Sequence, residues 1–267
     1  MARPTASDVV DEMFTRPEDA GVSLAFVAVR GGDVIAERYG RRPGNELEPA
    51  ADITAETTLL SWCMAKSITH AAVGLLIVDG LIDVDVPAPV PEWAGTEKEG
   101  ITLVQLLEMR SGLRFNEDYL DGDTSHCIEM LFGGTDPSFG HYAAGLPLDH
   151  VPGSVFNYSS GTSNIVARIV GDLVAGGPGG DPVRILPEGW RDHARTPTGH
   201  DGESGLDYGR HFWLWPAFPG SFAGRGYEGQ FVVVLPDRDL VMVHLGKTGI
   251  AHSRGLQMRL ARLAELL

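Results

Sequence analysis

The sequence predicts an α+β fold in which one antiparallel sheet is built from both ends of the chain and is flanked by helices. Near the N-terminus, the strand-like segments Val22–Val29 and Val34–Tyr39 surround a Gly-Gly turn. Near the C-terminus, Phe231–Leu235 and Leu240–Leu245 surround a Pro-Asp turn. The residues between these two hairpins have mainly helical periodicity. We therefore expect the strands of the two ends to meet in one sheet.

The composition and net charge of the chain indicate which kinds of partner it does not bind. The chain has 267 residues, 43% of them hydrophobic, which is enough for one large domain or two closely joined ones. Its net charge is −15. A chain this acidic repels nucleic-acid phosphates and anionic lipid surfaces, so we expect neither nucleic acid nor a membrane as a partner. No run approaches the roughly 20 apolar residues of a membrane span.

Two further features indicate a compartment. The first twenty residues lack the basic start and apolar run of a secretion signal. Cys63 and Cys127 are the only cysteines, too few for a disulfide framework. We therefore expect a cytoplasmic protein, and the sequence leaves its oligomeric state open.

The clearest helical pattern runs from Cys63 to Asp79, with Gly80 well placed to end the helix. Apolar residues recur there at three- and four-residue spacing and predict one buried stripe. The stripe consists of Met64, Ile68, Ala71, Ala72, Leu75 and Leu76.

Four further segments complete the predicted organisation. Helices are expected at Ile101–Met109, Ser160–Val174 and Ile185–Ala194, and a terminal helix carries Leu256, Leu260, Leu263 and Leu267 on one face. Residues 112–157 are rich in Gly, Asp and Pro, so we expect a long irregular lobe of the kind that covers binding sites.

We expect a single domain with two parts. The sheet part comprises about residues 1–60 and 205–267, and the helical lobe comprises about residues 61–204.

Cys63 and Lys66 are the first candidates for chemistry. A residue at a helix N-terminus meets the positive end of the dipole and free backbone N–H groups. Lys66 follows Cys63 by three residues and so shares its helix face. A thiol and an amine in this arrangement form a plausible acyl-transfer pair. The alternative is a small buried cysteine near a surface lysine.

Four segments, in order, resemble the penicillin-recognising serine hydrolases. This family includes class C β-lactamases, DD-peptidases, family VIII esterases and 6-aminohexanoate-dimer hydrolases. The segment SWCMAKSIT resembles its nucleophile motif, and ITLVQLLEMRSGL resembles its second helix. FNYSSGTSNIVARIVGDL is similar to its tyrosine motif, and GYEGQFVVVLPDRDLVMVHLG is similar to its closing hairpin. The resemblance covers nearly the whole chain and implies a β-lactamase/penicillin-binding-protein-like fold.

The resemblance also implies roles for three residues. Cys63 stands where the family has the serine that forms the acyl-enzyme. Lys66 matches the lysine that helps remove the nucleophile's proton, and Tyr158 matches the tyrosine that delivers a proton to the leaving group. Without the resemblance, Tyr158 would be interpreted as a packed aromatic residue.

The chain departs from the family pattern at the nucleophile and in the tyrosine motif. With Cys63 in place of serine, either the thiol acylates and turns over slowly or it is inert and the chain only binds ligand. An introduced Ser-to-Cys change would give the same sequence. The tyrosine motif has Ser160 where asparagine is common. Ser160 can still donate a hydrogen bond to a substrate carbonyl, with a shorter reach.

A third departure concerns the Lys-Thr-Gly motif of the family. Lys247-Thr248-Gly249 is present, but it follows the closing hairpin, so we interpret it as a coincidence. The family's motif belongs near residues 221–226, which contain no lysine. There the backbone N–H near Gly224 would complete an oxyanion hole with that of Cys63. Arg225 would hold a substrate carboxylate, unless it is simply a surface arginine.

The chain also lacks a segment that family members carry after the tyrosine-motif helix. Gly176 to Gly180 bridges that interval directly, so the helical lobe is predicted to be shortened there. We favour a deletion, natural or constructed, over the loss of an optional insertion.

No metal or cofactor is expected. The nine histidines form no His-Glu-x-x-His pattern and no close Cys/His cluster. His70 shares a helix face with Lys66, where it would either support the site or pack in the core.

The resulting hypothesis is a hydrolase of small esters or amides. Its acyl-enzyme would form on Cys63, with Lys66 and Tyr158 transferring protons. The alternative is a silent or trimmed scaffold that binds ligand without turnover.

Overall fold

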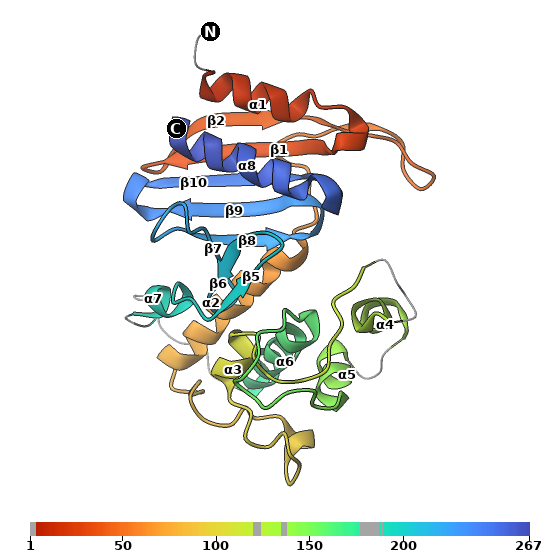
Figure 1. Ribbon diagram of the computed structural model, residues 1–267, viewed down its shortest axis with the longest axis vertical. Coiled ribbons are helices and arrows are strands. Elements are labelled where there is room, and N and C mark those ends of the chain that lie inside the picture. The colour runs from red at the N-terminus through yellow and green to blue at the C-terminus, as the bar shows by residue number, and fades with distance from the viewer. Residues whose placement is uncertain (1–3, 120–123, 135–137, 177–186, 188) are drawn as a thin grey trace. The chain divides into compact units, whose positions relative to one another are not determined.

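The computed structural model describes residues 4–119, 124–134, 138–176, 187 and 189–267. The chain forms two compact units (Figure 1). The sheet unit comprises Met1–Ala65 and Trp213–Leu267, and the helical unit comprises Lys66–Phe212. Both ends of the chain therefore belong to the same unit.

Strands from both ends of the chain share one antiparallel sheet in the sheet unit, as predicted. β1 from the N-terminal part pairs with β10 from the C-terminal part, with Val22 opposite Lys247 and Arg30 opposite Leu240. Alternate residues of β10 are buried, which is the pattern of a strand with one face toward the core. Within this unit the strands run in the order β2 (Asp33–Tyr39), β1 (Val22–Arg30), β10 (Leu240–Lys247), β9 (Gln230–Leu235), β8 (Phe222–Gly226) and β7 (Trp213–Leu214).

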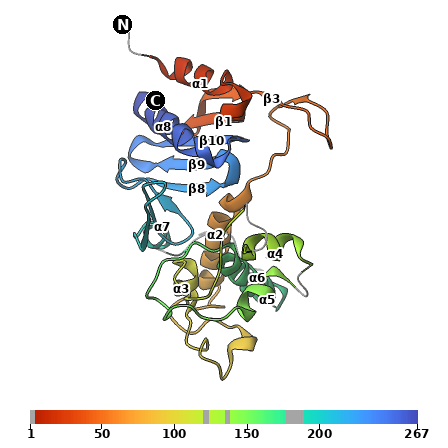
Figure 2. The same ribbon diagram turned by 45° about the vertical axis from the view of Figure 1, so that its right-hand side comes forward.

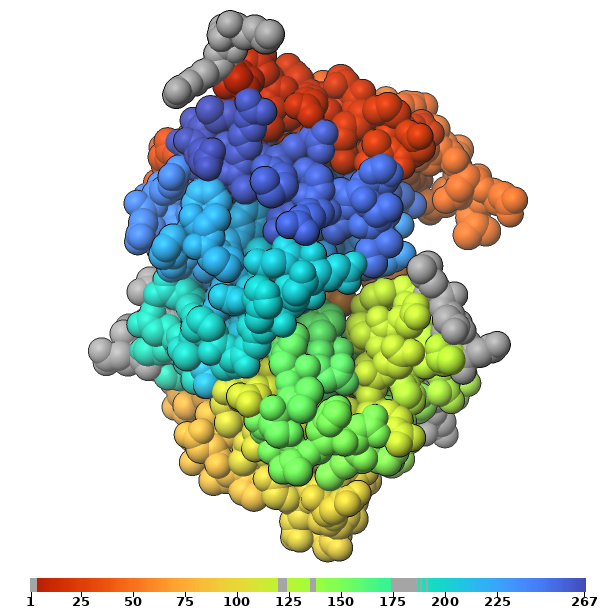
Figure 3. Space-filling model, viewed as in Figure 1, coloured from red at the N-terminus to blue at the C-terminus, as the bar shows by residue number. Residues whose placement is uncertain are grey.

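Two helices from opposite ends of the chain pack against each other in this unit (Figures 2 and 3). They are α1 (Ala6–Phe14) and α8 (Ile250–Leu266). α1 begins with a capping box, in which Thr5 and Asp8 satisfy each other's backbone N–H groups. α8 buries Leu256, Leu260 and Leu263, as the sequence predicts, whereas the fourth predicted residue, Leu267, follows the helix and is only partly buried.

Short elements connect these strands and helices. They are η1 (Glu18–Ala20), β3 (Arg41–Arg42), β4 (Ala51–Asp52), η2 (Trp62–Met64), η4 (Tyr227–Gly229) and η5 (Pro236–Arg238). β3 and β4 pair with each other as a separate antiparallel ladder.

The helical unit has its own core around Trp93 and the buried faces of its helices. Leu103, Leu106, Leu107 and Ile165 are almost fully buried in it. The elements are α2 (Ala65–Val78), η3 (Pro91–Trp93), α3 (Leu103–Leu107), α4 (His126–Phe132), α5 (Phe139–Gly145), α6 (Ser160–Gly176), α7 (Trp190–Ala194), β5 (Gly199–Asp201) and β6 (Leu206–Tyr208), with α2 starting one residue before the unit.

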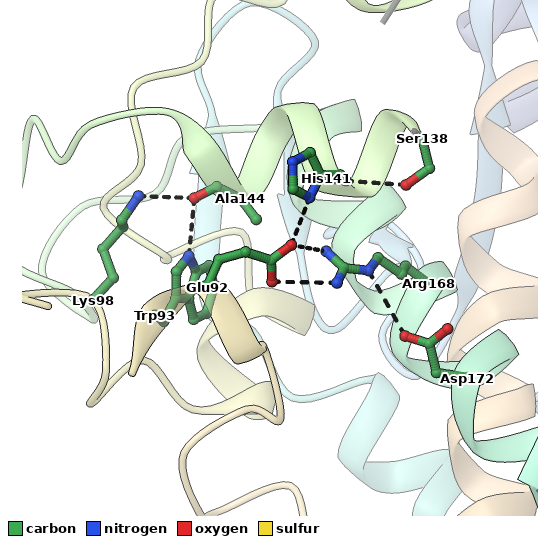
Figure 4. Close-up of polar contacts among 8 residues, drawn as sticks. All are labelled: Glu92, Trp93, Lys98, Ser138, His141, Ala144, Arg168 and Asp172. Atoms are coloured by element: carbon green, nitrogen blue, oxygen red, sulfur yellow. Dashed lines mark hydrogen bonds and ion pairs between the residues drawn. The ribbon is translucent and has the colours of Figure 1, made fainter. Parts of the chain in front are cut away.

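A polar cluster joins three elements of the helical unit (Figure 4). Both carboxylate oxygens of Glu92 in η3 accept hydrogen bonds from Arg168 of α6, at 2.7 and 3.2 Å. His141 of α5 donates to the same carboxylate at 2.6 Å. The hydrogen bonds from Arg168 are the main cause that lowers the pKa of Glu92 to about 2.

The predicted buried stripe of α2 is wrong. Ile68 is 71% exposed and Leu75 is 42% exposed, and Leu76 is the one predicted member that is buried. The inner face instead carries Lys66, His70 and Val73. Apolar periodicity misplaced the buried face because polar side chains of α2 point inward, where they have partners.

Two other expectations about the helical unit need correction. The second helix spans only Leu103–Leu107, because Thr102 caps its start and Met109 adopts a left-handed φ of 58°. The expected irregular lobe contains α4 and α5, whose N-caps are Ser125 and Ser138. Serine at an N-cap starts a helix even within a Gly-rich stretch.

Two expectations concern the end of this unit. The third helix continues to Gly176, and residues 177–180 of the predicted joint lie outside the described residues. Of the helix predicted at Ile185–Ala194, the structure describes α7 from Trp190.

Candidate active site

Cys63 lies in η2, a 3₁₀ turn that precedes α2. The sequence placed it at the start of the α-helix, but the α-helix begins at Ala65. The thiol belongs to no disulfide, and the residue is half-buried. Cys63 therefore meets the first requirement of a nucleophile, partial access to solvent.

The residue before Cys63 has an unusual backbone. Trp62 has a φ of 47°, in the left-handed region that bulky residues rarely adopt. Its indole contacts the Tyr227 ring edge-on, with centroids 5.8 Å apart. Such strain persists where packing over-determines the conformation, and it is frequent at functional sites. The unusual backbone thus stands directly before the candidate nucleophile.

β8 approaches this turn closely because of its glycines. η2 packs against β8 and β9. A Cβ at Gly226 would collide with the carbonyl oxygen of Ser61, so a side chain there would push the strand away. Gly224 lies two residues earlier, on the same face of the strand, and is buried. The structure thus brings the Gly224 strand and the Cys63 turn together within the sheet unit.

Arg225 points the other way. Successive side chains of a strand alternate between its two faces, so Arg225 lies opposite Gly224 and Gly226. Its guanidinium donates to Ser253 Oγ of α8 at 3.1 Å and lies 5.4 Å from the centre of the Trp213 ring. The structure therefore does not bring Arg225 to the face that carries Cys63.

The Lys-Thr-Gly triplet is separate from β8. Lys247 ends β10, and Gly249 caps the N-terminus of α8. In the strand order, β9 separates β10 from β8. The strand beside η2 is the one that lacks a lysine, which agrees with the interpretation of the triplet as a coincidence.

In the helical unit, the starts of α2 and α6 bring three predicted residues together. Lys66 is only 7% exposed. Its Nζ donates to Ser160 Oγ at 2.9 Å and lies 4.9 Å from the centre of the Tyr158 ring. The Tyr158 ring in turn packs against the edge of the Tyr208 ring, with centroids 5.8 Å apart. A buried ammonium between a hydroxyl and an aromatic ring is held firmly.

Sequence reasoning missed Glu117. Its carboxylate accepts from the backbone N–H of Ser160 at 2.6 Å and from Ser160 Oγ at 2.5 Å. A hydroxyl has one proton to donate, and in this structure that proton goes to Glu117 rather than remaining free for a substrate. The expected role of Ser160 as a donor to substrate stays a prediction, and it requires this hydroxyl to change its partner. No local pattern could have revealed the pair, because 43 residues separate its members.

A cluster of buried histidines supports the first turn of α2. His211 Nδ1 donates to the carbonyl oxygen of Lys66 at 2.9 Å, and its own carbonyl accepts from Ser67 Oγ at 2.8 Å. Burial lowers the pKa of His211 to about 3, so the ring is neutral near pH 7. These bonds fix the backbone that carries Lys66.

His70 belongs to the core, the second of its two expected roles. It stacks on Trp190 with ring centroids 4.5 Å apart. Burial, together with the nearby His211, His193 and Arg210, lowers its pKa to about 2.

Within the part of the chain that the structure describes, no three His, Cys, Asp or Glu side chains are grouped so that they could hold a metal ion. None of the helices described is both long enough and apolar enough to cross a membrane.

Comparison with solved structures defines the fold class. The structure matches a family VIII carboxylesterase with a TM-score of 0.71 and 13% identity, covering 97% of this chain and 96% of the other. It matches an octameric penicillin-binding protein homologue from Pyrococcus abyssi with a TM-score of 0.69 and 14% identity, covering 97% and 76%. This is the α+β fold of β-lactamases and penicillin-binding proteins.

Sequence comparison shows the family. The family model for β-lactamases matches residues 10–178, more than half of the chain. The chain therefore belongs to the β-lactamase family. It is also 34% identical over 99 residues to the 6-aminohexanoate-dimer hydrolase of Paenarthrobacter ureafaciens. That match spans 36% of this chain and 23% of the hydrolase.

Proposed function

We propose that this protein hydrolyses small esters or amides through an acyl-enzyme on Cys63. The observation that carries the proposal is the setting of Lys66. It is a buried lysine, hydrogen-bonded to Ser160 and placed over the Tyr158 ring, and a free thiol lies three residues before it. Membership of the β-lactamase family and the match to a 6-aminohexanoate-dimer hydrolase support the reaction class.

In the proposed first step, the Cys63 thiolate attacks the substrate carbonyl. Lys66 accepts the thiol proton, and the Sγ–C bond forms. The backbone N–H groups of Cys63 and Gly224 stabilise the oxyanion. The bond to the leaving group then breaks, and Tyr158 delivers a proton to that alkoxide or amine. A thioester on Cys63 results.

In the second step, water attacks the thioester carbonyl. Tyr158, which gave up its proton in the first step, takes a proton from water, the Sγ–C bond breaks, and Lys66 returns its proton to the sulfur. The products are a carboxylic acid and the regenerated thiol.

We propose esters and linear amides rather than β-lactams as the substrate class. The strand beside η2, Phe222–Gly226, contains no lysine that would attract a substrate carboxylate, and Arg225 lies on its other face. Ser160, in the place of an asparagine, already donates its proton to Glu117. Two features of β-lactam recognition are thus missing.

A second function is favoured by the nucleophile itself. A thiol in a site shaped for a hydroxyl can leave the chain as a scaffold that binds ligand without turnover. Sulfur is larger than oxygen and forms a thioester, so its position relative to the proton-transfer groups changes.

The deciding experiment is intact-protein mass spectrometry after brief incubation with p-nitrophenyl acetate, followed by peptide mapping. The proposal predicts an acetyl adduct on Cys63 that disappears with time. Cys127 is 1% exposed and serves as the internal control, because a buried thiol should not react. A stable adduct on Cys63 means a working nucleophile that does not turn over. Folded protein with no adduct on Cys63 contradicts the hydrolase proposal and leaves the binding scaffold.

A further inference from the structure

We propose that Glu117 is the positioning residue that sets Lys66 for proton transfer, acting through Ser160. The inference rests on the proposed function, because it assigns a further residue to the same site. It follows from a continuous chain of contacts in the helical unit that leads from Glu117 through the Ser160 hydroxyl to the Lys66 ammonium.

The hydrogen bonds among these three residues have defined directions. Ser160 Oγ gives its one proton to Glu117, so at the 2.9 Å contact Lys66 Nζ is the donor and Ser160 Oγ is the acceptor. At the 2.5 Å contact with Glu117, the carboxylate oxygen accepts and Ser160 Oγ donates. Because Glu117 takes the hydroxyl proton, a lone pair of the same oxygen faces Lys66. The carboxylate thereby determines which way the serine hydroxyl points.

Glu117 also has an electrostatic effect on Lys66. Ser160 is the first residue of α6, so Lys66 lies near the positive end of that helix dipole. When Lys66 takes the thiol proton it becomes a cation, which is unfavourable there unless an anion is close. Glu117 supplies that anion and also accepts the backbone N–H of Ser160 at 2.6 Å, one of the N–H groups left free at the start of the helix.

Several donors hold the Glu117 carboxylate in place. Its Oε1 also accepts from the hydroxyl of Tyr119 at 2.5 Å, and Cys127 Sγ lies 3.9 Å away. The carboxylate thus has donors from the segment that carries it, from α4 and from α6. A side chain fixed from several directions can fix its neighbours in turn.

The test compares Glu117→Gln with a matched control, Glu92→Gln. Both residues are glutamates of the helical unit that accept several hydrogen bonds, and Glu92 belongs to the separate cluster with Arg168 and His141. An amide accepts at one oxygen where the carboxylate accepts at two, so in Glu117→Gln one of the two Ser160 donors loses its partner. Thermal unfolding of both variants identifies any loss of stability.

The first readout is independent of activity. The chain has three lysines, Lys66, Lys98 and Lys247, so ¹³C-lysine labelling gives three sets of Cε–Hε signals in NMR spectra. Lys98 Nζ donates to the carbonyl oxygens of Ala144 and Leu146 and is an internal reference. We expect Glu117→Gln to shift the Lys66 signals and to make its two Hε protons equivalent, while Lys98 and Lys247 stay unchanged. Unchanged Lys66 signals in folded Glu117→Gln would overturn the proposal.

The second readout is kinetic. We expect Glu117→Gln to lower kcat for p-nitrophenyl acetate by about 10- to 100-fold, the range of a general acid–base contribution, with KM changed less than about threefold. Glu92→Gln should keep both constants. In a Ser160→Ala background, Glu117→Gln should lower kcat by less than about a further threefold, because the contact from Glu117 through Ser160 to Lys66 is already broken. Full additivity of the two losses would contradict action through Ser160.

The two readouts separate the two proposals. If neither the parent chain nor Cys63→Ser hydrolyses the ester, the proposed function fails, and the NMR spectra still decide whether Glu117 positions Lys66.

Discussion

Lys66 Nζ donates a hydrogen bond to Ser160 Oγ at 2.9 Å, although 94 residues separate the two in the sequence. The contact joins the first turn of α2 to the first residue of α6. It places a buried cation beside the tyrosine motif, with Tyr158 below it and Glu117 beyond Ser160. The proton-transfer groups of the proposed reaction are thus assembled within one unit of the protein.

Removing the Lys66 ammonium should abolish most of the activity. Lys66→Met keeps a long side chain but has no proton to transfer. We expect kcat/KM for p-nitrophenyl acetate to fall by about 100-fold, the size of a general acid–base contribution. Lys98→Met is the matched control. Lys98 is the other lysine of the helical unit, and its Nζ donates to the carbonyl oxygens of Ala144 and Leu146, so its loss should leave kcat/KM unchanged. A Lys66→Met rate within threefold of the parent would exclude Lys66 from the chemistry.

Exchanging the nucleophile distinguishes an enzyme from a scaffold. A serine hydroxyl needs the Lys66 base more than a thiol does, and the family site is shaped for it. We expect Cys63→Ser to hydrolyse the ester at least about tenfold faster than the parent chain, since one general base contributes that much or more. Cys63→Ala should be inactive. If Cys63→Ser and Cys63→Ala are equally inactive and folded, the binding scaffold is the better interpretation.

A methyl group at Gly226 should move β8 away from the Cys63 turn. In Gly226→Ala the new Cβ meets the Ser61 carbonyl oxygen. We expect the free energy of unfolding in urea to fall by about 1–3 kcal/mol, the usual cost of overpacking, and ester hydrolysis to fall with it. Gly171→Ala is the matched control, because a Cβ at that position of α6 would meet no atom within 4 Å apart from the backbone of its own helix. The control should be neutral or stabilising by about 0.5–1 kcal/mol, since alanine favours helices. Equal stability of the two variants would contradict the close approach.

The buried histidines should make the protein sensitive to acid. The pKa of His211 is lowered to about 3, and its ordinary value is 6.5. Between these two pH values the unfolded chain binds a proton at this residue that the folded chain does not bind. The stabilisation is therefore fully present above pH 6.5 and is lost as the pH falls toward 3. For each buried histidine whose pKa is lowered in this way, the free energy of unfolding should fall by about 1.4 kcal/mol for every pH unit below 6.5.

Urea unfolding at pH 7, 6 and 5 measures this slope. The variant His211→Gln removes one titrating group, so its stability should depend less steeply on pH than that of the parent chain. An identical slope in both proteins would mean that His211 does not contribute.

Local sequence patterns predicted the parts of this fold whose determinants are close in the chain. Both terminal hairpins, the sheet that joins them and the buried leucines of α8 follow from alternation, turn residues and helical spacing. The motif resemblance likewise led to the family. The hairpins and the buried leucines were accessible because each depends on residues within a few turns of one another, and the sheet was inferred from strand signals at both ends of the chain. The single domain, the compartment and the roles of Cys63, Lys66 and Tyr158 stay predictions.

Contacts between distant segments determined the rest. The buried face of α2 carries Lys66 and His70 because Ser160 and Trp190, far along the chain, supply their partners. Arg225 and Gly224 are neighbours in sequence but lie on opposite faces of β8. Glu117 reaches Ser160 only after the chain has folded. Burying a polar group is favourable only when a partner satisfies it, and apolar periodicity contains no information about that partner.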